Sequence, residues 1–153
     1  IFDLFSDYDK QVEKMVEEQT KMTEKMFEEQ RENSKKQLAD MYFKMAESTK
    51  DSDLQMAARY YENAAVNGLL QAQYEIGECY AFGKGVPQDY KIAALWFEKA
   101  AENGNADAQY ALGICHELGY GVEKSSQYMK WYTRAALQGH EKAKEALKRL
   151  TGA

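Results

Sequence analysis

The sequence predicts an all-α protein in which antiparallel helix pairs repeat along the chain and follow one long N-terminal helix. Three observations support this fold class. Only one proline occurs among 153 residues, so few positions force a helix to break. A motif recurs after 36 residues in the second half of the chain. Residues 5–46 lack glycine and proline and are rich in Glu, Lys, Gln and Met, which are mostly good helix formers.

The first segment, residues 1–36, is predicted to be a long amphipathic helix. Its seam positions alternate in steps of three and four, as in a heptad repeat; they are Phe5, Tyr8, Val12, Met15, Gln19, Met22, Met26, Glu29 and Asn33. The seam is mostly apolar as far as Met26. We therefore predict that this helix makes contacts through Phe5, Tyr8, Val12, Met15, Met22 and Met26.

Two interpretations of this helix remain open. It packs on the following repeats or leads into them, or it forms a coiled coil with a second chain or a partner. Association is the expected outcome, because the polar end of the seam separates the apolar stripe from the first repeat. Binding to a membrane surface is disfavoured, since anionic lipids repel acidic pairs such as Glu17-Glu18 and Glu28-Glu29.

Repeats organise the rest of the chain. Residues 71–80 recur as residues 107–116, and the similarity continues through a Gly-x-Gly-Val loop that begins at Gly83 and again at Gly119. The predicted repeat region, 37–153, consists of a degenerate first repeat (37–70), a second (71–106), a third (107–140) and a capping helix (141–153).

Each repeat is predicted to contain two antiparallel helices, A and B. Helix A runs from about Ala72 to Phe82 with Ala72, Ile76 and Tyr80 on one buried stripe. Gly77 and Gly113 lie inside this helix, where glycine costs about 1 kcal/mol relative to alanine. Their recurrence predicts that a neighbouring helix approaches closely there.

The ends of the helices carry capping signals. Gly83 suits a left-handed C-terminal cap of helix A, and Gly85 is expected to keep the loop tight. Asp53 and Asp89 are predicted to cap helix B, which ends at Asn67-Gly68, Asn103-Gly104 and Gln138-Gly139. After Gly139, Ala143 and Leu147 are expected to face inwards on a capping helix with a polar outer face.

These motifs carry a family resemblance. The run Ala-Gln-Tyr-x-x-Gly-x-x-Tyr-x-x-Gly-x-Gly-Val from Ala72, followed by Trp-Phe-x-Lys-Ala-Ala-Glu-Asn-Gly from Trp96, resembles the Sel1-like repeat family, which is related to the tetratricopeptide repeats. The first repeat departs from this pattern: it lacks the Gly-x-Gly-Val loop, and Ala39 is placed at the position of Gly77. The resemblance implies an α-solenoid that acts as a non-enzymatic scaffold or adaptor for a protein partner. The alternative is a structural protein that dimerises through the N-terminal heptads.

The predicted partner surface is a row of helix A residues on the concave face. Successive helical residues turn by about 100°, so an inward stripe directs other positions outwards. The row comprises Tyr74, Glu75, Glu78, Phe82, Tyr110, Ile114 and Leu118. For Tyr74 and Tyr110 we favour the alternative that they pack against the next repeat.

Several function classes are excluded. A net charge of −5 and a pI near 5.2 argue against nucleic-acid binding through phosphate contacts. No run of about 18 apolar residues predicts a membrane span. Because the chain begins with Ile1, it indicates a fragment or a processed form, which leaves an upstream signal or anchor open.

No catalytic residue, metal or cofactor is expected. Cys79 and Cys115 occupy equivalent positions and are predicted to be unpaired, packed thiols, which weakly favours a reducing compartment such as the cytoplasm. With His116 and His140 they show no metal-ligand spacing. Adjacent Cys115 and His116 point about 100° apart on a helix, so they do not form a nucleophile–base pair.

Overall fold

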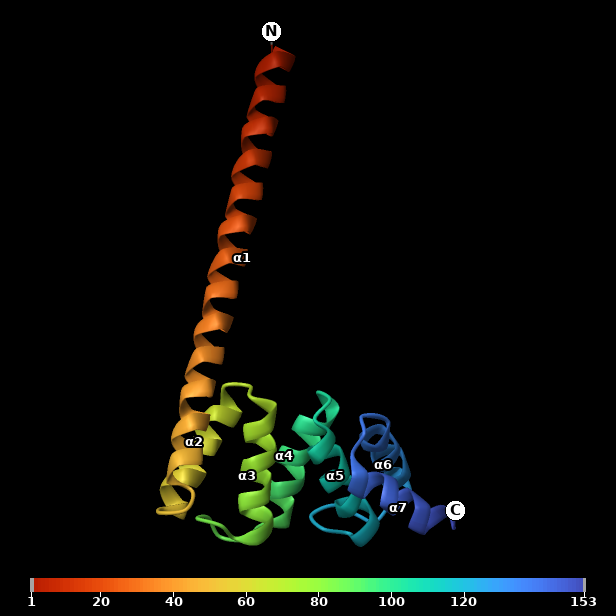
Figure 1. Ribbon diagram of the computed structural model, residues 1–153. Coiled ribbons are helices and arrows are strands. Elements are labelled where there is room, and N and C mark those ends of the chain that lie inside the picture. The colour runs from red at the N-terminus through yellow and green to blue at the C-terminus, as the bar shows by residue number, and fades with distance from the viewer. Residues whose placement is uncertain (1, 153) are drawn as a thin grey trace. The chain divides into compact units, whose positions relative to one another are not determined.

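The computed structural model describes residues 2–152, in which all regular secondary structure is helical (Figure 1). This confirms the predicted all-α class. The helices are α1 (Phe2–Thr49), α2 (Leu54–Val66), α3 (Leu70–Phe82), α4 (Tyr90–Glu102), α5 (Ala106–Leu118), α6 (Gln127–Leu137) and α7 (Glu141–Thr151). No helix in this described range is long and apolar enough to span a membrane.

The chain divides into two compact units, Ile1–Gln37 and Leu38–Ala153. The first unit contains most of α1, and the predicted long N-terminal helix is confirmed. From residue 3 to residue 37 every side chain is exposed except Val12, which is half-buried. Ion pairs one turn apart, such as Lys21–Glu17 at 2.6 Å and Lys35–Glu32 at 3.0 Å, support the exposed helix.

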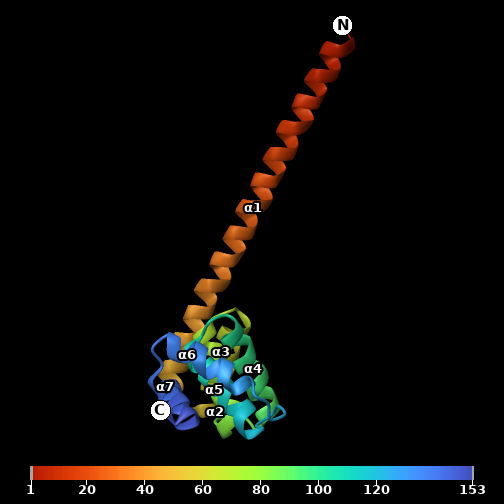
Figure 2. The same ribbon diagram turned by 90° about the vertical axis from the view of Figure 1, so that its right-hand side faces the viewer.

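In the second unit each helix packs on the next, from α2 to α7. One core cluster contains Ala46, Tyr61 and Ile76, and a second contains Phe97 and Trp131 with many alanines around them. Figure 2 views this array from its C-terminal side, so that its helices overlap in projection. Small alanines allow the helices to approach closely around a few large aromatic side chains.

The glycines inside helix A face aromatic rings of helix B. A Cβ atom on Gly77 would lie 2.5 Å from Cε1 of Phe97, and one on Gly113 would lie 2.5 Å from Cε1 of Tyr132. The predicted close approach is therefore confirmed. Its source is an aromatic ring and not the backbone of the neighbouring helix, which the repeated glycines alone did not reveal.

The Gly-x-Gly loop connects helices A and B of one repeat and contacts the preceding repeat. Gly83 adopts a left-handed conformation (φ 65°) and ends α3 as predicted. Gly85 does more than keep the loop tight, because its Cβ would lie 2.1 Å from the carbonyl oxygen of Leu54 in the preceding repeat. A Cβ atom on Gly121 would likewise lie 2.0 Å from the carbonyl oxygen of Tyr90. The second glycine of the loop thus lets one repeat rest on the start of helix B of the previous one.

The predicted caps of helix B are present. Asp53 accepts a hydrogen bond from the Met56 amide at 3.0 Å, and Asp89 accepts one from the Ile92 amide at 3.1 Å. The C-caps are Asn67, Asn103 and Gln138. These side chains and the following glycines fix where each helix B ends.

The first repeat corrects the predicted alignment. Ala39 and Ala46 are 1% and 0% exposed, and they have the same spacing as buried Ala72 and Cys79 in α3. The helix ends match as well, because α1 ends at Thr49 and α3 ends at Phe82. Lys44, and not Ala39, therefore occupies the position of Gly77. The prediction was wrong because the loop of the first repeat is shorter and has no glycine from which to align the helix.

Candidate protein-binding surface

The two tyrosines of the predicted row lie against neighbouring aromatic rings. The Tyr74 ring centroid is 5.9 Å from that of Phe97. The Tyr110 ring is 5.6 Å from that of Tyr132 and stacks on His140 at 4.8 Å. Both tyrosines are half-buried, so each presents only part of its ring to solvent.

The apolar ends of the row are more open. Phe82 is 63% exposed and Leu118 is 46% exposed, while Ile114 is half-buried. Lys84 lies over the Phe82 ring, with its Nζ 5.4 Å from the ring centroid. These residues leave apolar surface at the C-terminal ends of α3 and α5.

A hollow of about 490 Å³ lies between α5, α6 and α7, and we call it the α5–α7 hollow. Its lining residues are Tyr110, Ile114, Glu117, Leu118, Tyr132, Lys142, Glu145, Ala146 and Arg149. The helix α5 contributes three members of the predicted row to it. The capping helix contributes charged side chains, so the hollow combines an apolar wall with a charged wall.

Glu117 organises the polar part of this hollow. It accepts hydrogen bonds from the Tyr132 hydroxyl and from Arg149, the latter at 2.7 Å. Burial opposes ionisation of Glu117, but the hydrogen bonds from Tyr132 and Arg149 outweigh it and lower its pKa. Burial, followed by the bond to Glu117, raises the pKa of Tyr132. The carboxylate is therefore held in its charged form by two donors.

Glu75 and Glu78 line a different hollow of about 260 Å³ beside α2 and α3, together with Lys50, Asp51, Leu54, Ala57, Tyr61, Cys79 and Lys84. Burial raises the pKa of Glu75, although its hydrogen bond from Gln71 acts in the opposite direction. The predicted row thus has a polar part at α3 and a more apolar part at α5.

The capping helix is fastened by a residue that the sequence did not assign. His140 accepts the Ala143 amide at Nδ1 over 3.2 Å and contacts Asp107 Oδ1 through Nε2 at 3.0 Å. It therefore acts as the N-cap of α7. Within that helix Ala143 is buried as predicted, and Leu147 is only half-buried. Histidine is an uncommon cap, so its position before α7 carried little signal.

Cys79 and Cys115 are free and buried, in agreement with the prediction of packed thiols. Burial raises the pKa of each to about 11, which keeps them protonated and poorly nucleophilic. His116 points its Nδ1 at the Ser125 hydroxyl, 3.1 Å away. Residues 2–152 contain no group of three or more His, Cys, Asp or Glu side chains placed to hold a metal ion.

Glycine–aromatic contacts within the second and third helix pairs, and glycine loops that contact the preceding pair, define a solenoid of the tetratricopeptide-like class. The Sel1 repeat family matches residues 37–69, 70–105 and 106–140. The chain therefore belongs to the Sel1 repeat family, which confirms the resemblance drawn from the motifs. No match was found among curated proteins.

Solved structures share this architecture. A Sel1 repeat protein from Oxalobacter formigenes is 36% identical, with a TM-score of 0.69 over 73% of this chain and 34% of its own. The protective antigen c5321 of uropathogenic Escherichia coli, described as displaying an SLR fold, is 29% identical, with a TM-score of 0.66 over 80% of this chain and 26% of its own. The chain thus spans about a third or less of these two relatives.

A third similar structure is shorter. Cysteine-rich protein B from Helicobacter pylori is 24% identical, with a TM-score of 0.61, and the match covers 75% of this chain and 96% of that one. At this identity the likeness concerns the fold alone. Sel1 repeats generally mediate protein–protein interaction and generally act as non-catalytic scaffolds.

Proposed function

We propose that this chain is a non-enzymatic adaptor that binds a protein partner through the helix A row of α3 and α5. The observation that carries the proposal is the α5–α7 hollow. Tyr110, Ile114 and Leu118 line it from α5, while Lys142 and Arg149 line it from α7. Interface centres are typically apolar or aromatic and surrounded by polar groups. We expect an apolar side chain of the partner to enter the hollow and polar backbone or charged groups to meet α7.

The size of the hollow supports this mode of binding. At about 490 Å³ it lies within the usual range of ligand pockets, so one or two large side chains fit it. Phe82 lies at the equivalent position to Leu118 one repeat earlier and extends the apolar surface along the array. A partner segment that crosses both repeats would contact Phe82 and the hollow together.

The test compares partner capture by matched surface variants of the full chain. Phe82→Glu, Ile114→Asp and Leu118→Asp place charge on the proposed surface. The control variants Leu95→Asp and Leu137→Asp place the same charge on α4 and α6, at side chains that are 66% and 83% exposed. Captured proteins are quantified by mass spectrometry, and thermal unfolding is followed by the fluorescence of Trp96 and Trp131.

We expect the row variants to lose a captured protein that both control variants retain, with melting temperatures close to that of the unaltered chain. Equal capture by all variants would contradict the proposed surface. A large fall in melting temperature for Ile114→Asp and Leu118→Asp would instead assign these residues to the core. In that case the exposed Phe82 variant still tests the surface.

A further inference from the structure

The helical segment 4–26 carries an apolar stripe that stays exposed along its length. Exposed fractions are 66% for Phe5, 65% for Tyr8, 61% for Met15, 66% for Met22 and 63% for Met26. A helix gains most of its stability from burying such a stripe and little from residue propensity alone. The question is what covers these side chains.

We propose that this stripe pairs with the same stripe of a second copy of the chain, in an antiparallel coiled coil. The heptad seam is almost self-complementary when one helix is reversed. In the register that places Phe5 opposite Met22, Tyr8 faces Gln19 and Val12 faces Met15. The pair is two-fold symmetric, so each of these contacts occurs twice, once from each copy. Every seam position from 5 to 22 therefore has a partner.

Layer size favours this arrangement over a parallel one. In a parallel pair each side chain faces its own copy, so the layers of Phe5 and Tyr8 would be wide and the layer of Val12 would be narrow. In the antiparallel register each aromatic ring faces a flexible, unbranched side chain (Met22 or Gln19), and the small Val12 faces Met15. Facing large with small residues lets layers interlock evenly. The Tyr8 hydroxyl is also placed to bond the Gln19 amide, which gives this polar seam residue a partner.

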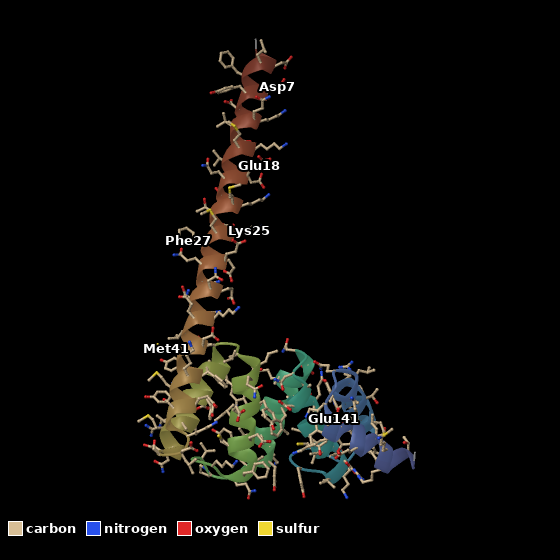
Figure 3. All side chains as sticks on the ribbon, viewed as in Figure 1. Asp7, Glu18, Lys25, Phe27, Met41 and Glu141 are labelled. Carbon is tan, nitrogen blue, oxygen red and sulfur yellow. The ribbon has the colours of Figure 1, made fainter. Side chains whose placement is uncertain are left out.

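Charge favours the same orientation. Residues 2–13 carry four acidic side chains (Asp3, Asp7, Asp9 and Glu13) and one basic, Lys10, whereas residues 14–25 carry three of each sign. A parallel pair would align the two net-negative halves. An antiparallel pair aligns each with a half of zero net charge, which lowers the repulsion. In Figure 3, the charged side chains of Asp7, Glu18 and Lys25 extend outwards from the helix.

The polar end of the seam fits this register as well. Glu29 and Asn33 lie beyond the paired segment 5–22, so neither enters the interface. A parallel coiled coil that continued past Met26 would bring two copies of Glu29 together, and like charges facing each other are destabilising. The antiparallel pair therefore uses seam positions 5–22 and ends before the seam becomes polar at Glu29.

The first experiment measures the mass of the full chain by sedimentation equilibrium over a wide range of micromolar concentrations. We expect a monomer–dimer equilibrium. Val12→Asp and Met15→Asp should each raise its dissociation constant by about 100-fold or more, since they place a charge in a buried layer. Thr20→Asp, outside the seam, should change it little. Both tryptophans lie in residues 38–153, so their fluorescence checks independently that the repeats remain folded.

The second experiment determines orientation from distances between nitroxide labels on introduced cysteines. In the proposed register residue 14 lies opposite residue 13, whereas residue 3 lies opposite residue 24. Labels at Lys14→Cys should therefore be close, and those at Asp3→Cys should be separated by about 30 Å along the axis, at 1.5 Å per residue. The native thiols are buried, and unlabelled controls verify that they do not react.

A chain that remains monomeric would overturn the proposal, whether hydrogen exchange then shows the stripe protected or open. A dimer that Val12→Asp and Met15→Asp leave intact would overturn it too, because another surface would then hold the copies together. Short distances at both label positions would establish a parallel pair and overturn the register. This proposal does not depend on the helix A row, so it stands or falls separately from the proposed adaptor function.

Discussion

At one core position the second repeat has phenylalanine (Phe97) and the third has tyrosine (Tyr132), so the two side chains differ by one hydroxyl oxygen. Phe97 of α4 packs on Gly77, and its counterpart Tyr132 of α6 packs on Gly113 with nearly the same distances. One turn further along helix A, the second repeat has buried Ala81, whereas the third has Glu117. Glu117 accepts the hydroxyl hydrogen bond of Tyr132.

This difference shows how the repeat tolerates variation. In the second and third repeats, the glycine fixes where the ring lies, and the residue four positions later decides whether the ring can carry a hydroxyl. A buried hydroxyl needs a partner, so tyrosine and glutamate belong together, as do phenylalanine and alanine. Since Glu117 also lines the α5–α7 hollow, the pair gives the third repeat a polar group at the proposed binding surface.

Filling the shared glycine position should have the largest effect. Gly77→Leu and Gly113→Leu insert a side chain where even a Cβ would lie 2.5 Å from an aromatic carbon. We expect each variant to lower the free energy of unfolding by about 3 kcal/mol, because overpacking displaces the ring. Urea unfolding measures the loss, with Glu98→Leu as an exposed helical control. If both variants were as stable as the unaltered chain, the close-packing account would be contradicted.

Exchanging the hydroxyl should have the next largest effect. Phe97→Tyr buries a hydroxyl beside Ala81 with no carboxylate to accept from it, which should cost about 2 kcal/mol. Adding Ala81→Glu should recover part of this loss by recreating the pair of the third repeat. Urea unfolding of both single variants and the double variant gives the coupling between the sites. If the two substitutions changed the free energy of unfolding strictly additively, a tyrosine–glutamate hydrogen bond would not explain why the repeats differ at these two positions.

Most of the second and third repeats could be predicted because their signals are local. Gly83, Asp89 and Asn103 act on backbone within a few residues of themselves, so sequence position alone indicates their roles. The contacts of Gly85 with Leu54 and of Gly77 with Phe97 are made across the array. The sequence marked these glycines as unusual, but only the packed structure identifies their neighbours.

The candidate surface was less predictable for the same reason. Helical spacing directs Phe82 and Leu118 outwards, but it does not show that α7 forms the second wall of the hollow. The roles of Arg149 and Glu117 depend on a contact across 32 residues. In the first repeat, the short loop before α2 removed the glycine landmarks, and the alignment shifted by more than one helical turn.

The Glu117 carboxylate should make the third repeat sensitive to acid. Its folded-state pKa is lower than the ordinary value of 4.5, so its stabilising effect is complete above that pH and is lost as the pH falls below it. Glu117→Gln should therefore lower stability by about 1 kcal/mol at pH 7, because a bond to a charged acceptor is replaced by a neutral one.

Urea unfolding at several pH values tests this expectation. The stability difference between the unaltered chain and Glu117→Gln should shrink below about pH 4.5. Glu98→Gln, an exposed change of the same kind on α4, should show a much smaller difference at every pH. A difference for Glu117→Gln that persists at low pH would mean that shape, and not charge, explains the loss.

The smallest expected effect is a gain. Buried Gln73 and Gln109 each donate to the end of the preceding helix B, at Ala65 and Ala101, but only Gln109 has its Oε1 occupied, by the Gln138 amide at 2.9 Å. Gln73 Oε1 has no hydrogen-bond partner in the described part of the chain.

Asn103 occupies the C-cap position of Gln138 one repeat earlier, and its side chain is one methylene shorter. Asn103→Gln should let the amide exchange its exposed bond to the Lys99 carbonyl oxygen, at 2.8 Å, for a bond to the buried Gln73 Oε1. This exchange should raise the free energy of unfolding by about 0.5–1 kcal/mol. The gain should disappear in a Gln73→Met background, where no acceptor remains. If the gain persisted there, helix propensity at residue 103 would explain it, and a new bond to the buried Gln73 oxygen would not be its cause.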